Sequence, residues 1–139
     1  MAVIKRSKSD FFDDTWIYLE GVEVHGTGDR QDEVKEFIRG KNHRLEFHRN
    51  SEDEKNKHSI KVFGFTKKFI GENKYLLGYL QKVVTKAIIT GDFFDDVKPS
   101  RPYFRQGGRI FLDLVGSVKE EKEFKAFFEQ VLVEEGFVK

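Results

Sequence analysis

The chain has 139 residues, with 25 Lys or Arg against 24 Asp or Glu, so its formal net charge is +1. That length is typical of one domain, and 15 Phe, 4 Tyr and 1 Trp indicate a folded core, because disordered chains are poor in aromatic residues. The lack of Cys excludes disulfide frameworks, thiolate metal sites and cysteine nucleophiles, and the balanced charge means that nucleic-acid binding must be argued from local charge.

The N-terminal residues 1–14 are mostly polar and charged, and we expect about the first ten to fray. They hold no apolar stretch of the kind found in signal peptides, and no run in the chain is long enough to cross a bilayer. We therefore expect an intracellular protein, cytoplasmic or nucleoid-associated, that does not contact a membrane.

The first predicted elements are a strand and a short helix. Alternating apolar residues over 15–24 predict a strand bent at Gly21, followed by a turn at 26–29. The next segment has apolar residues at helical spacing, with Asp29 as the expected N-cap and Gly40 at its end.

The middle of the chain predicts a pair of strands and a hairpin. Residues 43–49 alternate as a half-buried strand, residues 49–57 hold no apolar side chain and form an exposed loop, and residues 58–65 resume strand character. Residues 67–73 are typical of a hairpin turn.

The last part of the chain predicts two helices around two strands. Residues 81–91 form a short helix that ends at Gly91, and residues 92–99 and 109–116 supply strands. Ser117 is the expected N-cap of a C-terminal amphipathic helix, whose apolar stripe is Phe124, Phe127, Phe128, Val131 and Leu132.

These elements predict a mainly β (α+β) fold. About six short strands are joined mostly by short turns, which favour antiparallel pairing. We expect a small antiparallel β-barrel with two inserted short helices and a C-terminal amphipathic helix. One domain spans 1–139, with 1–14 as a flexible segment and 117–139 as the closing helix.

Several short motifs occur in a definite order between about residue 15 and residue 116. They are Gly21-Val22, Leu45 with Arg49, Ile60-Lys61-Val62, Gly78-Tyr79-Leu80 and, in the helix that follows, Ala87. This order and spacing resemble the HIRAN domain, which is found at the front of some DNA-remodelling ATPases and alone in bacteria. The resemblance implies a barrel that binds single-stranded DNA or DNA ends, as in DNA repair.

In the best-understood HIRAN domains, the Tyr of a Tyr-Asp pair stacks on a base at the 3′ end of the DNA, and the Asp binds the terminal hydroxyl. The matching positions here are Lys55 and Asn56, while His58, Ser59 and Val24 replace the family's Asn, Ala and a further aromatic residue. Stacking on an aromatic ring contributes roughly 1–3 kcal/mol per base, and Asn lacks the charge that strengthens a hydrogen bond to a hydroxyl. The replacements therefore predict contacts to phosphates rather than to a base or a free 3′ hydroxyl.

Local charge supports the same interpretation. Residues 39–68 hold nine Lys or Arg against four Asp or Glu, whereas residues 118–136 hold three Lys against six Glu. A basic surface of this kind neutralises phosphates, although an ordinary solvated face stays an alternative because three consecutive acids lie in the same loop. The predicted nucleic-acid-binding residues are Arg49, Lys55, Asn56, Lys57, His58, Lys61, Tyr79, Tyr103 and Arg105.

The aromatic residues near these lysines allow two interpretations. They offer a stacking platform, but most of them fall on faces that a core must fill, so packing is the better explanation for Phe63, Phe65, Phe69, Tyr75 and Tyr79. Tyr103 and Phe104 differ, because Pro, Gly and Arg residues around them are typical of a loop. Two roles are equally expected for this pair. They contact a nucleic-acid strand or a protein partner at the rim of the barrel, or they cover the end of the barrel as part of its hydrophobic packing.

Other chemistries have weaker support in the sequence. Asp13-Asp14, Asp92 and Asp95-Asp96 raise the possibility of Mg²⁺, but adjacent residues on a strand point to opposite faces. Zinc-ligand spacing, a phosphate loop and a nucleophile elbow are missing from the sequence. We predict no catalytic residues, no metal and no cofactor.

Two classes of function remain. The first is a nucleic-acid-binding module that contacts DNA through phosphates. The alternative is a protein-interaction or dimerisation module that uses the Phe-rich C-terminal helix and does not bind DNA.

Overall fold

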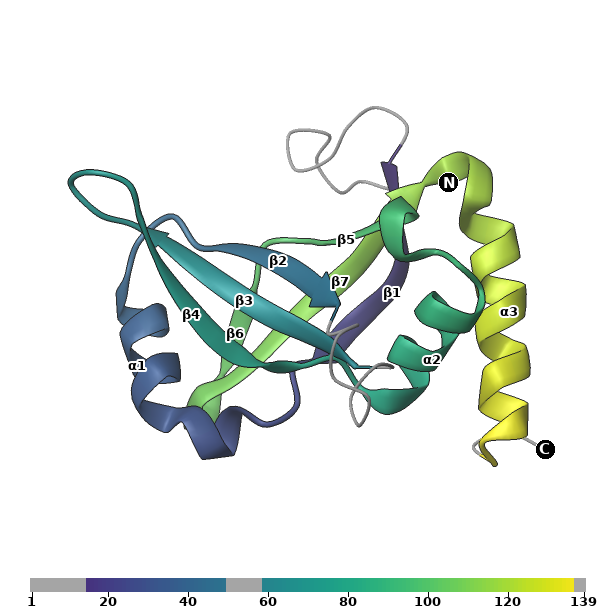
Figure 1. Cartoon of the computed structure of the whole chain (residues 1–139), viewed down its shortest axis with the longest axis horizontal. Coiled ribbons are helices and arrows are strands. Elements are labelled where there is room, and N and C mark those ends of the chain that lie inside the picture. Colours follow the sequence, from purple (N-terminus) through teal and green to yellow (C-terminus); the bar gives the residue numbers. More distant parts are fainter. Residues whose placement is uncertain (1–14, 50–58, 137–139) are drawn as a thin grey trace.

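The computed structural model describes residues 15–49 and 59–136 (Figure 1). The strands and helices are β1 (Thr15–Glu23), α1 (Gln31–Arg39), β2 (Arg44–Arg49), β3 (Ile60–Lys67), β4 (Glu72–Tyr79), α2 (Lys82–Thr90), β5 (Val97–Pro99), β6 (Tyr103–Arg105), β7 (Arg109–Ser117) and α3 (Glu121–Glu134). Short 3₁₀ turns occur at Thr27–Arg30, Phe94–Asp96, Gln106–Gly108 and Val118–Glu120. The predictions for residues 1–14 and for the loop at 50–57 lie outside the described residues.

The described strands form two antiparallel sheets. In one, β7 pairs with β1, β5 and β6, and the other has the order β2-β3-β4. A bridge between His25 and Tyr79 joins the sheets, and each backbone amide donates across it at 2.8 Å. The predicted mainly β, antiparallel architecture with inserted helices is confirmed. The described strands do not close into the predicted barrel but form two sheets joined at this bridge.

The prediction of a loop at Tyr103 and Phe104 is wrong, because this segment forms the strand β6. Its residues pair with the start of β7, Tyr103 with Phe111 and Arg105 with Arg109. Gly107 and Gly108 close the hairpin with φ values of 78° and 75°, a conformation that glycine adopts without steric cost. A strand of three residues is hard to predict from a sequence, because it is too short to show the alternation of apolar and polar residues.

The helix boundaries follow the predicted signals with one exception. Gly40 ends α1 and Gly91 ends α2, as expected. Ser117 accepts a hydrogen bond from the amide of Glu120 at 3.3 Å, which starts the 3₁₀ turn that leads into α3. Asp29 is not the N-cap of α1. It lies within the 3₁₀ turn Thr27–Arg30 that leads into the helix, and Arg30 occupies the N-cap position.

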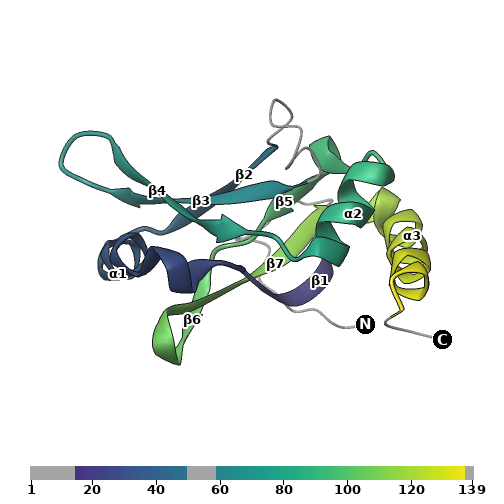
Figure 2. The ribbon, with the colours of Figure 1, turned by 60° about the horizontal axis from the view of Figure 1, so that its bottom comes forward.

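The core lies between the sheets and beneath the helices at both ends. Fully buried side chains from the two sheets include Val62, Leu77, Ile110, Leu112 and Leu114. Figure 2 shows β2, β3 and β4 above β7 and β1, with α1 at one end and α2 and α3 at the other. One face of the β2-β3-β4 sheet is therefore turned toward the core.

The C-terminal helix packs on its own chain. Phe124 and Val131 are 0% and 2% exposed, and Phe127, Phe128 and Leu132 are half-buried, so the predicted apolar stripe is confirmed. The ring of Phe124 stacks on Tyr18 of β1 at 5.0 Å and meets Phe93 edge-on at 5.1 Å. No helix among the described residues has both the length and the apolar composition needed to span a bilayer.

Candidate nucleic-acid interface

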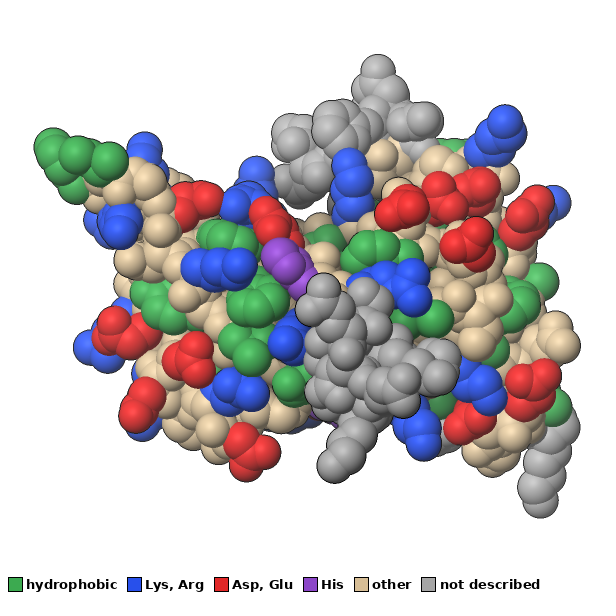
Figure 3. All heavy atoms as spheres, in the orientation of Figure 1, with side chains coloured by type: hydrophobic (Ala, Val, Ile, Leu, Met, Phe, Trp, Pro, Cys, Tyr) green, Lys and Arg blue, Asp and Glu red, His purple; other side chains and the backbone are tan. Residues whose placement is uncertain are grey.

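The β2-β3-β4 sheet has a second face that points away from the core, here called the outer face. Ile60, Val62, Gly64 and Thr66 of β3 are buried against the core, so the residues between them lie on the other side of the strand, where the guanidinium of Arg44 covers Phe65. Residues directly opposite each other on paired strands share a face. The outer face consists of Arg44, Glu46, His48, Lys61, Phe63, Phe65, Lys67, Glu72, Lys74, Leu76 and Tyr79. Figure 3 shows hydrophobic side chains interspersed with Lys, Arg and His over this sheet.

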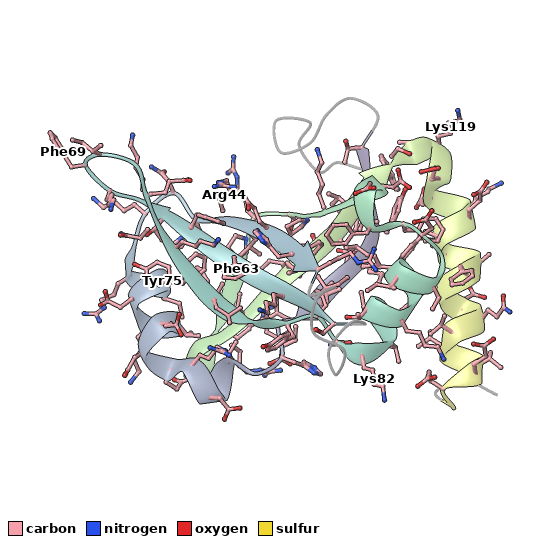
Figure 4. All side chains as sticks on the ribbon, viewed as in Figure 1. Arg44, Phe63, Phe69, Tyr75, Lys82 and Lys119 are labelled. Carbon is pink, nitrogen blue, oxygen red and sulfur yellow. The ribbon has the colours of Figure 1, made fainter. Side chains whose placement is uncertain are left out.

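Phe63 lies in the middle of the outer face (Figure 4). Its side chain is only half-buried. Nζ of Lys74 lies 4.5 Å from the centroid of the ring, and the imidazole of His48 meets the ring edge-on with centroids 4.7 Å apart. An aromatic surface is thus bordered by the ammonium group of Lys74 and by the imidazole ring of His48.

Arg44 on β2 connects the two edge strands of this sheet, β2 and β4, through its side chain. Its Nε and Nη2 donate to the carboxylate of Glu72 at 3.2 and 2.7 Å, and its Nη1 also pairs with Glu46. These hydrogen bonds lower the pKa of Glu46 and of Glu72, so both carboxylates stay ionised. The guanidinium also lies over the ring of Phe65, with Cζ 4.2 Å from its centroid. Arg44 therefore has a structural role on the outer face.

Two of the predicted site residues, Lys61 and Tyr79, lie opposite each other on β3 and β4. Tyr79 is held in place by its backbone bridge to His25. A Cβ added to Gly78 would lie 2.1 Å from the carbonyl oxygen of His25, so this approach of the two backbones requires glycine. That requirement gives a physical reason for the Gly78-Tyr79 motif.

Arg49 is at the same end of the sheet as Lys61 but on the opposite face. It pairs with Ile60, which is fully buried, and its Cζ lies 5.8 Å from the centroid of Phe94. The structure thus does not place Arg49 beside Lys61 on the outer face. The other predicted residues of this region, Lys55, Asn56, Lys57 and His58, lie outside the described residues.

Tyr103 and Arg105 belong to β6, in the other sheet. Figure 2 shows β6 on the opposite side of the molecule from β2, β3 and β4. Cζ of Arg105 lies 5.7 Å from the ring centroids of both Tyr103 and Phe111. Arg109 lies 5.1 Å from the Phe111 ring and donates to Glu23 at 2.9 Å. The predicted site is therefore divided between two separate groups of aromatic and cationic residues.

Sequence reasoning missed three contributors to the outer face, Arg44, His48 and Lys74. The alternation of β2 contained a signal for Arg44 and His48, because a strand that turns Leu45 and Phe47 toward the core must turn these two outward. Packing in the core is also the wrong explanation for Phe69, whose side chain is 100% exposed in the predicted hairpin turn, and for Phe63, which lies on the outer face.

The acidic residues do not gather into a metal site in the described part of the chain. No group of three or more His, Asp or Glu there could hold a metal ion. Asp95 and Asp96 lie in a 3₁₀ turn rather than on a strand, contrary to the prediction. Repulsion from the carboxylate of Asp96 raises the pKa of Glu120. Asp13 and Asp14 lie outside the described residues.

Comparison with known proteins yields one structural likeness. No family model matches the sequence, and a search of curated proteins finds no match. Among solved structures, the chain is similar to the HIRAN domain of human HLTF, with a TM-score of 0.49 and 14% sequence identity over 87% of this chain and 95% of that chain. The likeness says nothing of the ligand of this chain.

Proposed function

We propose that this chain is a nucleic-acid-binding module that holds single-stranded DNA across the outer face, mainly through phosphate contacts. The observation that carries the proposal is the half-exposed ring of Phe63, with Lys74 and His48 against it. Proteins that bind single strands combine aromatic rings, on which bases stack, with cations that follow the phosphates. The proposal is for a binding module of one domain and assigns no catalytic residue.

The phosphate contacts would come from lysines rather than from Arg44. The guanidinium of Arg44 is already engaged by two carboxylates, whereas Lys67 and Lys74 are exposed and Lys61 is half-exposed. Their long side chains can leave the sheet surface to meet a phosphate. The ammonium group of Lys74 can leave the ring of Phe63, so that a base stacks on the ring while Lys74 contacts a phosphate.

The connection between β2 and β3 would complete the site at one end of the outer face. Arg49 and Lys61 lie near its two ends, and Lys55, Asn56, Lys57 and His58 belong to it by sequence. We propose that Lys55, Asn56, Lys57 and His58 add phosphate contacts, so that a free 3′ hydroxyl is not required. Binding by Arg49, whose side chain lies on the opposite face of the sheet, stays a prediction of the sequence. Tyr103 and Arg105 lie on the other sheet, and their binding of nucleic acid stays a prediction of the sequence.

Fluorescence anisotropy with a labelled single-stranded oligonucleotide tests the proposal. The logarithm of the affinity should fall linearly with the logarithm of salt, and Lys61→Ala or Lys74→Ala should each reduce the slope by about 0.7, the value for one phosphate contact on a single strand. Phe63→Leu should weaken binding by about tenfold at every salt concentration, because it removes one stacking ring.

Lys119→Ala is the matched control. Lys119 is exposed at the start of the α3 region, well apart from Phe63 in Figure 4, and its loss should leave affinity and slope unchanged. No binding at low salt, or an equal effect of the control, would contradict the proposal. A 3′-phosphorylated oligonucleotide should bind at least as tightly as one with a 3′ hydroxyl, and Lys55→Ala should remove any gain from the phosphate.

A protein-interaction or dimerisation module remains the second candidate. Val133 on α3 is 52% exposed and Val118, just before the helix, is 48% exposed. Of the three Phe of α3, Phe124 is buried within the same chain and Phe127 and Phe128 are half-buried, which leaves less apolar surface for a partner. Sedimentation at several concentrations tests this candidate, since a dimer formed through α3 should dissociate on dilution and on Val133→Asp.

A further inference from the structure

The turn between β3 and β4 carries two large apolar side chains in contact with solvent. Phe69 is 100% exposed and Ile70 is 76% exposed. The hairpin reaches beyond the rest of the described chain, with Phe69 at its end (Figures 1 and 4). Turn positions are usually taken by Gly, Asn, Asp, Pro or Ser, so the turn itself gives no reason for this pair.

The turn is part of a regular two-stranded ribbon. The amide of Lys68 donates to the carbonyl of Gly71 at 3.2 Å, and Lys67 pairs with Glu72 directly below the turn. The amide of Lys67 also donates to the carbonyl of Lys41 at 2.9 Å. These bonds give the ribbon a defined shape up to its tip, so the two apolar side chains are presented in a fixed place.

The charge around the tip is positive. Lys67 and Lys68 precede Phe69 and are exposed, and Lys41 lies beside the base of the ribbon and is exposed as well. Glu72, the acid next to the turn, is bound by Arg44. An apolar tip with lysines beneath it fits an anionic partner that also offers an apolar layer, and base pairs stacked between phosphates have this composition.

The tip is continuous with the outer face. Lys67 belongs to the outer face and stands directly before the turn, and Lys74 lies between the turn and Phe63 on the same sheet. A single strand bound along the outer face would therefore lead toward the tip. This continuity favours DNA over a lipid surface, because cations lie beside the rings of Phe63 and Phe65 on that face, as in sites that bind bases joined by phosphates.

We propose that Phe69 and Ile70 form a wedge that enters a DNA duplex between stacked base pairs, where the duplex meets the single strand on the outer face. This inference rests on the proposed function. Apolar wedges of this kind unstack a base step and kink the duplex by roughly 20–90°, and basic residues beside them contact the flanking phosphates. A two-stranded ribbon has the width that a groove of DNA accepts.

The experiment uses the full chain and a duplex with a single-stranded tail, carrying 2-aminopurine at the junction. Binding should raise the 2-aminopurine fluorescence, because the wedge unstacks that base. The double variant Phe69→Ser, Ile70→Ser should lose the rise and bind the tailed duplex about tenfold more weakly, while its affinity for the single strand should stay within about twofold. Val133→Ser, which removes an exposed apolar side chain on α3, is the matched control and should match the unaltered chain.

The possible outcomes separate the two proposals. Equal binding and an equal fluorescence rise for the double variant would overturn the wedge and leave single-strand binding untouched. A chain that binds the duplex through the tip but binds no single strand would overturn the proposed function and leave the wedge. Tip-dependent binding to vesicles of phosphatidylcholine and phosphatidylserine, without tip-dependent duplex binding, would overturn the wedge in favour of a membrane. Unchanged thermal unfolding of the double variant shows that a loss of binding is not a loss of fold.

Discussion

The hydroxyl of Tyr103 on β6 donates a hydrogen bond of 3.0 Å to Oδ1 of Asp113 on β7, a residue that is only 5% exposed. The same oxygen accepts a bond of 3.1 Å from the amide of Gly21 in β1. One buried carboxylate thus fastens the short strand β6 to the bend of β1. Burial, followed by the bond to Asp113, raises the pKa of Tyr103, so the phenol keeps its proton.

Tyr103→Phe should therefore lower the free energy of unfolding by about 1–3 kcal/mol, since a buried acceptor loses a donor. Urea unfolding measures this difference. Arg105→Gln on the same strand is the control and should change stability by less than about 0.5 kcal/mol, because Arg105 is exposed. Equal stability of the Phe variant would show that the hydroxyl is dispensable.

The ion pairs of Arg44 predict a dependence on pH. Its hydrogen bonds lower the pKa of Glu46 and of Glu72 from 4.5, so the folded state favours the ionised carboxylates. This contribution is present above the unfolded pKa of 4.5 and is lost as the pH falls through the lowered folded values. The difference in stability between the unaltered chain and Arg44→Gln should be largest at neutral pH and shrink below about pH 4.5. A constant difference across that range would contradict the prediction.

Gly64 of β3 leaves room for the helix α1. A Cβ at this position would lie 2.5 Å from Cε1 of Phe37 and 2.7 Å from Cδ1 of Leu77, both fully buried. Gly64→Ala should therefore destabilise the fold by about 1–3 kcal/mol through overpacking. Gly28→Ala is the matched control, because nothing lies within 4 Å of a Cβ there. Thermal unfolding of both variants tests the prediction, and similar shifts in the two would contradict it.

Phe124 anchors the C-terminal helix between β1 and the segment after α2. Its ring contacts Tyr18 and Phe93, and its side chain is 0% exposed. Phe124→Ala should cost about 3–5 kcal/mol, whereas Val133→Ala, at a side chain that is 52% exposed, should cost far less. If α3 instead served a dimer, Phe124→Ala would change the sedimentation of the chain more than its stability.

Most elements of this fold were predictable because their signals are local. The alternation of apolar residues along β2 and β3 and the glycines that end α1 and α2 require no knowledge of the rest of the chain. Ser117 likewise marks the start of the last helical region through a bond to Glu120, only three residues away. The strand β6 was not predicted, because three residues are too few to show an alternating pattern. Its strand conformation depends on pairing with β7.

The sequence by itself determined the mainly β architecture, the antiparallel pairing, the amphipathic last helix and the basic character of the central segment. Which aromatic rings face the core was decided only by the tertiary structure. Phe63 and Phe104 are both half-buried, yet Phe104 packs against the core with its ring centroid 5.9 Å from that of Phe37, while Phe63 faces outward beside Lys74. Local strand geometry makes successive side chains point to opposite faces. Which face becomes buried depends on the helix or sheet that covers it, and those elements come from distant parts of the chain.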